Sequence, residues 1–262
     1  LLSRKFGTYF FWKAEMCKRA DCPFGETCLF SHSESARHKR PLELSDFREL
    51  AAEIESLPGS FHGCVHSCCT AEGVDMAVRL VQWGRQFLRG KVYASFGIHP
   101  SNFEDYTPEV EARLLRGLEA CGPNGIAWGE CGLDYYRRDE AKSEPAVRAR
   151  MREVFARQAQ LAVRRRLPLV VHSREAEEDT MAVLCEFVPP THPVHLHSFM
   201  GSIAMVKAFL ERWPAGCVGV AGAVTYHANW NPDGSVYEGS LADIAGAVPL
   251  DRLLLETDGP FM

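Results

Sequence analysis

Hydrophobic and polar positions follow two alternating periods along residues 44–262. Short apolar runs of strand character alternate with stretches whose apolar residues recur three and four positions apart, as on one face of a helix. The expected strands are Phe61–Cys69, Lys91–Gly97, Gly125–Glu130, Leu167–His172, Pro193–His197, Gly216–Gly222 and Arg252–Asp258. The expected helices are Leu44–Ser56, Val74–Leu88, one opened by Thr107 and Pro108, Glu144–Arg165, Glu175–Phe187, Ser202–Trp213 and Leu241–Ala247.

This strand–helix alternation predicts an α/β fold with a parallel sheet. A doubly wound sheet usually carries a glycine-rich phosphate loop after its first strand, and the sequence has none there. The seven expected strands after residue 60 therefore favour a TIM (β/α)8-type barrel. We expect its first strand to be atypical or missing and its C-terminal helix to be absent.

Composition limits where the chain works and what it binds. The chain of 262 residues is 46% hydrophobic, and it has no apolar run long enough to cross a membrane and no signal peptide at its start. We therefore expect an intracellular protein of the nucleus or cytoplasm, without a membrane partner. The net charge of −5 means that any binding of nucleic acid has to be local. The chain begins without Met and stops after an apolar run, so both ends are expected to be cuts through a longer protein.

The first forty residues carry a separate metal-binding pattern. In a chain without a secretory signal, ten cysteines indicate metal-bound or buried thiols. Three thiolates and one imidazole complete a tetrahedral zinc site. The ligands would be Cys17, Cys22, Cys28 and His32. We expect a zinc module over residues 1–36, a linker over 37–43 and the barrel over 44–262.

This module resembles the CCCH zinc-finger family in its ligand spacing and in Phe30 between the last two ligands. Members of that family commonly bind single-stranded RNA by stacking bases on exposed aromatic rings. Aromatic and basic side chains of this module suit stacking and phosphate contact. They are Tyr9, Phe10, Phe11, Trp12, Phe24, Lys13, Lys18 and Arg19. The alternative is that the aromatic rings pack the finger against the main domain and the finger is purely structural.

Four residues that ligate metals stand at the ends of expected strands. They are Glu130, His172, His197 and Asp258. A barrel gathers the C-terminal ends of its strands on one face, and this donor set suits Zn²⁺, Mn²⁺ or Mg²⁺. Taken singly, His172 is also explained as a hydrogen-bonded strand end, and Asp258 as a cap of the following turn. Together the four predict a site for one or two divalent ions.

The segments around these residues form an ordered series of motifs. They are Phe61-x-Gly63-Cys64, Gly97–Pro100, Gly129–Tyr135, His172–Ala176, Phe187–Pro190, His197-x-Phe199-x-Gly201-Ser202 and Glu256–Pro260. From about Leu42 to its end, the chain resembles the TatD family of metal-dependent deoxyribonucleases, and most closely the vertebrate TatD-domain-containing type. The resemblance implies a TIM barrel that hydrolyses DNA phosphodiesters, often from an end, with nucleic acid as partner.

The resemblance also implies roles for single residues. Glu130 would bridge two metals, and His172 and His197 would complete the shell of one of them. Asp258 would hold the other metal and help to orient or deprotonate the attacking water, which makes Glu130 and Asp258 the catalytic pair. Substrate binding would fall to His99 and Arg174, although Arg174 also suits a surface ion pair with Glu175 or Glu178. Glu256 would orient groups that surround the ligands.

One family motif is missing. The family's first strand ends in Thr-His-x-His-Leu, and the zinc finger occupies the corresponding stretch, residues 28–36. His62 and His66 are expected to be core or rim residues of the next strand. Two hypotheses follow: a nuclease with one well-formed metal, or a nucleic-acid-binding protein that uses its finger and keeps the barrel as a weakened scaffold. A third is hydrolysis of a small amide or ester, because the same barrel site serves that chemistry.

Overall fold

The computed structural model describes residues 43–56, 62–136, 144–222 and 241–256. Its centre is a seven-stranded sheet in which the strands follow one another in chain order and every neighbouring pair is parallel. The strands are β1 (Cys64–Cys68), β2 (Val92–Phe96), β3 (Gly125–Asp134), β4 (Leu169–Arg174), β5 (Val194–Leu196), β6 (Cys217–Val220) and β7 (Leu253–Leu255). This confirms the predicted α/β fold and its parallel sheet.

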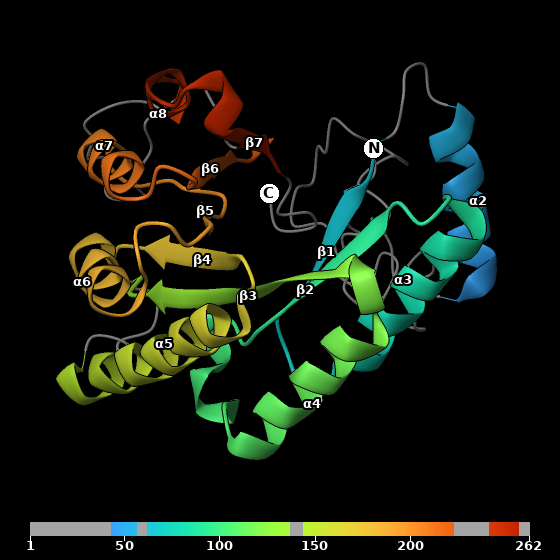
Figure 1. Ribbon diagram of the computed structural model, residues 1–262, viewed down its shortest axis with the longest axis horizontal. Coiled ribbons are helices and arrows are strands. Elements are labelled where there is room, and N and C mark those ends of the chain that lie inside the picture. Colours follow the sequence, from blue (N-terminus) through green and yellow to red (C-terminus); the bar gives the residue numbers. More distant parts are fainter. Residues whose placement is uncertain (1–42, 57–61, 137–143, 223–240, 257–262) are drawn as a thin grey trace, which may run out of the picture.

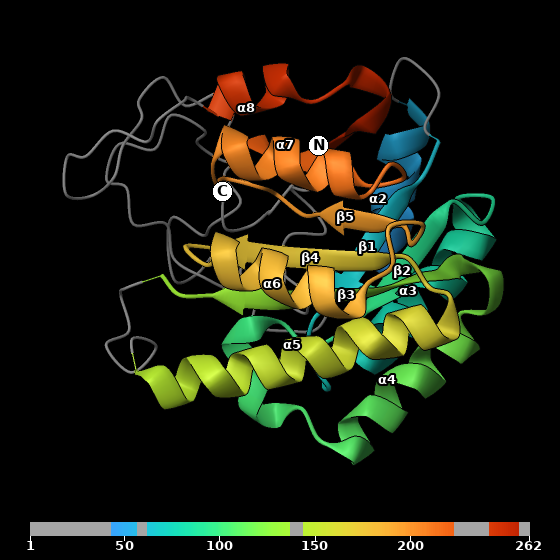
Figure 2. The same ribbon diagram turned by 60° about the vertical axis from the view of Figure 1, so that its left-hand side comes forward.

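Helices connect the strands and lie on the outside of the sheet, which forms a half-barrel (Figures 1 and 2). They are α2 (Leu44–Ser56), α3 (Val74–Phe87), α4 (Pro108–Ala120), α5 (Pro145–Arg165), α6 (Glu177–Phe187), α7 (Ile203–Arg212) and α8 (Leu241–Ala247). Strands β1 and β7 are the two edges, and within the described ranges no strand joins them. None of the described helices is both long and apolar enough to cross a membrane.

Local sequence explains where several helices begin. The Thr107 side chain accepts a hydrogen bond from Val110 N at 3.3 Å, and Pro108 occupies the first turn of α4, as the sequence predicted. Ser202 caps α7 in the same way, because its Oγ accepts from Met205 N at 3.1 Å. Each cap satisfies an amide that the helix itself leaves without a partner.

The longest strand departs from expectation at the residue of greatest interest. Strand β3 does not end at Glu130 but continues to Asp134, and its pairing with β4 shifts register between Trp128 and Cys131. Gly129 has φ +132°, a conformation that favours glycine, and a Cβ on Gly97 would lie 2.7 Å from the Cα of Gly129. The irregular segment and the close approach of β2 therefore depend on these two glycines.

A buried glutamine of α5 fixes the loop that carries His99. The Gln158 side chain is 1% exposed and bonds both backbone groups of Ile98. Its Oε1 accepts from Ile98 N at 3.0 Å, and its Nε2 donates to Ile98 O at 3.1 Å. This pair of bonds replaces the sheet partners that the chain loses where β2 ends, and it sets the position of the next residue, His99.

Replacing Gln158 by Leu should lower the free energy of unfolding by about 2–4 kcal/mol, because both buried backbone groups of Ile98 lose their partner. Urea unfolding followed by circular dichroism measures the change. Gln160→Leu, at a partly exposed position of the same helix, is the control. Equal midpoints for the two variants would show that Ile98 does not depend on Gln158.

Candidate metal centre

Glu130 is the centre of the site. It lies in the irregular part of β3 and is 5% exposed. Its two carboxylate oxygens face different histidines, with Oε1 2.8 Å from His172 Nδ1 and Oε2 3.7 Å from His197 Nε2. His172 belongs to β4 and His197 follows β5, so neighbouring strands bring together three of the four predicted ligands. Asp258, the fourth, lies outside the described residues.

Each of the two histidines lies between Glu130 and a further carboxylate. His172 Nε2 is 3.4 Å from Asp134 Oδ2, and His197 Nδ1 is 2.6 Å from Glu256 Oε1. A carboxylate behind an imidazole fixes the ring orientation and its tautomer, an arrangement that recurs around metal-binding histidines. Glu256 lies behind His197 on the side away from Glu130. Asp134 was not anticipated, because it follows Glu130 by four residues and the expected strand ended at Glu130.

His99 is close to the Glu130 carboxylate, but we describe it as a hydrogen-bond donor at Nε2 and not as a metal ligand. Its Nε2 lies 3.3 Å from His172 Nδ1 and 3.8 Å from Glu130 Oε1. Its Nδ1 accepts a hydrogen bond from Ser101 N at 3.1 Å. A neutral imidazole that accepts at Nδ1 carries its proton on Nε2, and a protonated nitrogen cannot ligate a metal. His99, Glu130 and His172 are close enough to share an ion, and so are His195, His197 and Glu256. Because His99 accepts at Nδ1, we assign it to hydrogen bonding.

Two more residues reach the centre without having been singled out in the sequence. Cys69, directly after β1, places its Sγ 3.7 Å from Glu130 Oε2. Burial, together with the charge of Glu130, raises the pKa of Cys69 well above its ordinary value, so the group is a thiol that donates to the carboxylate. His195 of β5 lies 3.0 Å from Glu256 Oε1. Cys69 ends an expected strand, but it was not chosen among the strand-end ligands, and His195 lies inside β5, where strand-end position gave no signal.

The carboxylates are ionised although they are buried. Burial opposes the charge of Glu130, but the charge of His197 and the hydrogen bond with His172 hold its pKa well below the ordinary range. For Glu256, burial is likewise outweighed by His195 and His197, and the pKa falls to about 2. His172 shows the complementary effect: burial alone would lower its pKa, but Asp134 and Glu130 raise it to about 9.

The donor set fits a divalent ion. Carboxylate oxygens and imidazole nitrogens from Glu130, His172 and His197 are ligands of Zn²⁺ and Mn²⁺, and Mg²⁺ accepts the carboxylate. The Nε2 atoms of His172 and His195 are buried, and they face the carboxylates of Asp134 and Glu256 at 3.4 and 3.0 Å without hydrogen-bond geometry. Such a concentration of buried charge and ring nitrogens is costly unless a cation or proton joins it.

Arg174, at the end of β4, contacts an aromatic ring. Its guanidinium carbon lies 3.9 Å from the ring centre of Tyr136. In the part of the chain that the structure describes, it makes no ion pair with Glu175 or Glu178. Because Asp134 pairs with Arg174 in the sheet register, Arg174 is at the same strand ends as the Glu130 group.

The remaining predicted residues have simple outcomes. His66 lies half-buried on β1, where burial of its ring lowers its pKa to about 4. His62 is exposed and precedes β1. The finger ligands Cys17, Cys22, Cys28 and His32 and the predicted linker up to residue 42 lie outside the described residues.

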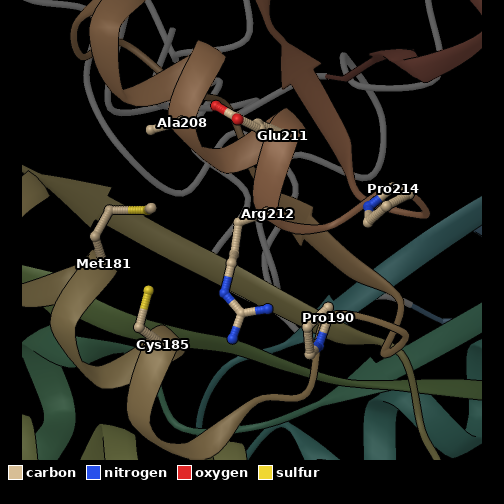
Figure 3. Close-up of a pocket in the computed structure, with 7 residues that line it drawn as sticks. All are labelled: Met181, Cys185, Pro190, Ala208, Glu211, Arg212 and Pro214. Carbon is tan, nitrogen blue, oxygen red and sulfur yellow. The ribbon is translucent and has the colours of Figure 1, made fainter.

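A separate hollow of about 590 Å³ lies on the helical layer (Figure 3). It is lined by Met181 and Cys185 of α6, by Ala208, Glu211 and Arg212 of α7, and by Pro190 and Pro214. None of these residues belongs to the group around Glu130. The buried charge and the ring nitrogens point to the strand ends as the functional site.

The raised pKa of His172 makes a prediction for the metal-free protein. The stabilisation by its imidazolium is complete below the unfolded pKa near 6.5 and is lost as the pH rises through about 9. Relative to His172→Asn, the wild type should therefore lose about 1–3 kcal/mol of its advantage in unfolding free energy between pH 6.5 and 9.5. Urea unfolding in the presence of a chelator measures this difference. A difference that stays constant across this range would refute the raised pKa.

Comparisons with known proteins identify relatives of this chain. The sequence profile of the family described as TatD related DNase matches residues 42–262. The 3'-5' RNA nuclease TATDN2 of Homo sapiens is 32% identical over 216 residues, which are 82% of this chain and 25% of that protein. The deoxyribonuclease Tat-D of Schizosaccharomyces pombe is 37% identical over 165 residues, which are 62% of this chain and 46% of the relative.

A bacterial relative and a solved structure extend the comparison. The 3'-5' ssDNA/RNA exonuclease TatD of Erwinia amylovora is 32% identical over 170 residues, 65% of this chain and 59% of that one, so the chain spans less than two thirds of each of these curated relatives. The crystal structure of the TatD homologue YjjV from Escherichia coli K12 superposes with a TM-score of 0.60 at 26% identity, covering 75% of this chain and 67% of that one. On this evidence the chain belongs to the TatD-related DNase family.

Proposed function

We propose that this chain is a metal-dependent phosphodiester hydrolase that removes nucleotides from the 3′ end of single-stranded nucleic acid. The observation that carries the proposal is the position of Glu130 between His172 and His197 at the ends of neighbouring parallel strands. Membership of the family supports the reaction class. The names of the human and Erwinia relatives, which are described as 3'-5' nucleases, support the direction of cleavage.

The ion in this proposal is Zn²⁺, Mn²⁺ or Mg²⁺, held by Glu130, His172 and His197. Asp258 would serve a second ion that shares Glu130. When bound, such ions lower the pKa of a coordinated water and neutralise charge that develops on the phosphate. Glu130 suits the shared position, because its pKa keeps it ionised and each of its oxygens already faces a different imidazole.

The remaining side chains prepare the site for a phosphate. Asp134 and Glu256 hold the ring orientations of His172 and His197. His99 offers an Nε2–H donor toward the carboxylate and, with substrate bound, toward a phosphate oxygen. Arg174 is held by its contact with Tyr136, which leaves the edge of the guanidinium to form paired hydrogen bonds with the phosphate.

A second candidate is a nucleic-acid-binding protein with a weakened barrel. The observation that favours it is the absence of the Thr-His-x-His-Leu segment from the whole sequence, which removes two family ligands from the Asp258 side of the site. In this case Cys17, Cys22, Cys28 and His32 would hold zinc, and the finger would bind single-stranded RNA.

Replacing Glu130 by Gln should abolish metal-dependent cleavage. The wild type is expected to shorten 5′-labelled single-stranded RNA or DNA from its 3′ end with Mn²⁺ or Mg²⁺, and chelation should stop it. Glu130→Gln should be slower by about 100-fold or more, because the shared anionic ligand is lost. Glu153→Gln, on the exposed face of α5, is the control. Full activity of Glu130→Gln would rule out this site, whereas binding without cleavage by the wild type would favour the second candidate.

Replacing Cys22 by Ser tests the finger independently of the barrel. We expect one zinc per chain to be lost, because a structural zinc site needs all four of its ligands. Affinity for single-stranded RNA should fall about tenfold if the finger stacks a base. Cys185→Ser is the matched control, because Cys185 is an exposed free thiol on α6. Zinc content measured by mass spectrometry and RNA binding measured by fluorescence anisotropy decide the outcome. Unchanged zinc content would exclude the finger.

A further inference from the structure

A further histidine, His195, lies next to the metal centre, on the side of Glu256. His195 of β5 precedes His197 by two residues, and side chains two positions apart on an extended chain point to the same side. The two rings are 5.9 Å apart and nearly perpendicular. Both approach the same atom, since His197 Nδ1 lies 2.6 Å and His195 Nε2 lies 3.0 Å from Glu256 Oε1.

We propose that His195 is a positioning residue, which fixes the Glu256 carboxylate and through it the tautomer and ring orientation of His197. This inference rests on the proposed function, because its effect is the presentation of His197 Nε2 to the ion that Glu130 shares. The consequence is that the metal affinity of the site depends on a side chain that does not touch the metal.

The two ring nitrogens of His197 make contacts of different length. Two atoms bound to one zinc ion stand about 3.3 Å apart in tetrahedral geometry. The 3.7 Å between His197 Nε2 and Glu130 Oε2 is too long for a hydrogen bond and suits a shared ion. The 2.6 Å between His197 Nδ1 and Glu256 is a hydrogen-bond length. His197 therefore donates from Nδ1 to Glu256 and keeps the Nε2 lone pair for the ion.

Glu256 is held on both of its oxygens. Ser198 N donates to Oε2 at 2.6 Å, while the two imidazoles approach Oε1. His195 Nε2 lies 3.0 Å from the same Oε1 without hydrogen-bond geometry, so the hydrogen bond at this oxygen goes to His197 and the His195 ring packs against the carboxylate. An apolar residue at position 195 would leave Glu256 free to turn away from His197.

The neighbouring strand β6 leaves room for the side chains of His195 and Glu256. Gly219 of β6 lies against it, and a Cβ added there would overlap the Glu256 carboxylate and stand 2.8 Å from His195 Nε2. Any side chain at position 219 would push the two groups apart. Gly219→Ala is therefore a second way to disturb the pair, which removes no hydrogen-bonding group.

The experiment measures Mn²⁺ binding by electron paramagnetic resonance, because Mn²⁺ prefers oxygen and nitrogen ligands and leaves the thiolate finger to zinc. His195→Leu should weaken binding about 10- to 100-fold without changing the number of ions bound, because positioning carboxylate–imidazole contacts have effects of that size. His195→Gln, which keeps a nitrogen donor, should recover most of the affinity. Gly219→Ala should resemble His195→Leu.

Activity measurements and a matched control complete the test. At saturating Mn²⁺, His195→Leu should recover kcat, and KM for the oligonucleotide should be unchanged. His192→Leu is the control, because His192 precedes β5, is buried and bonds Leu167 O at 2.9 Å away from the centre, whereas His195 is half-buried. It should bind Mn²⁺ as the wild type does.

Several outcomes would overturn the proposal. Unchanged Mn²⁺ affinity in His195→Leu would remove the positioning role, and equal loss in His192→Leu would show that any buried histidine of this region matters only for the fold. One ion fewer in His195→Leu would make His195 a ligand of a separate ion. A wild type that binds no Mn²⁺ would instead refute the proposed function, which distinguishes the two failures.

Discussion

The rest of the site depends on the interaction of one buried carboxylate, that of Glu130, with two imidazoles. Burying the Glu130 charge would cost several kcal/mol if it stood alone. The structure offsets this cost with His172 on one oxygen and His197 on the other, and Asp134 and Glu256 support those rings from behind. In the metal-free state a proton on His172 balances part of the charge, since the pKa of that residue rises to about 9. Ion binding must displace that proton, so the interactions that stabilise the empty centre also set the pH dependence of filling it.

The backbone makes this arrangement possible before any side chain contributes. The shift of register between Trp128 and Cys131 turns Glu130 toward β4 and β5 in the middle of a strand. Gly97 and Gly129 allow the neighbouring backbones to approach, and Gly219 leaves room for the side chains of Glu256 and His195. Three glycines on three different strands thus surround one cluster of charged groups. Larger residues at these positions would separate the strands that carry the ligands.

The sequence predicted the parts of this structure that depend on local pattern. Alternation of strand and helix gave the parallel sheet, and the rule that parallel strand ends meet gave the proximity of Glu130, His172 and His197. Asp134 was not predicted, because β3 is irregular and continues four residues beyond its expected end at Glu130. His195 was not predicted as a site residue, because a histidine inside an apolar strand looks like a core residue in the sequence. Only its contact with Glu256 in the structure distinguishes it. Cys69 comes from β1, whose distance from β3 along the sheet no spacing in the sequence reveals.

The two parts of the centre depend on different strands of the sheet. Glu130, His172 and His197 belong to or follow β3, β4 and β5, whose neighbours are all present in the described sheet. Glu256 follows β7, an edge strand whose Leu254 and Leu255 are 40% and 87% exposed. Its backbone is nevertheless bound to β6, because Glu256 N donates to Val220 O at 3.0 Å. The ion position at His197 therefore depends on the inner strands of the half-barrel and on the pairing of β7 with β6 at its edge. A second position beyond Asp258 would depend, in addition, on whatever lies between β7 and β1.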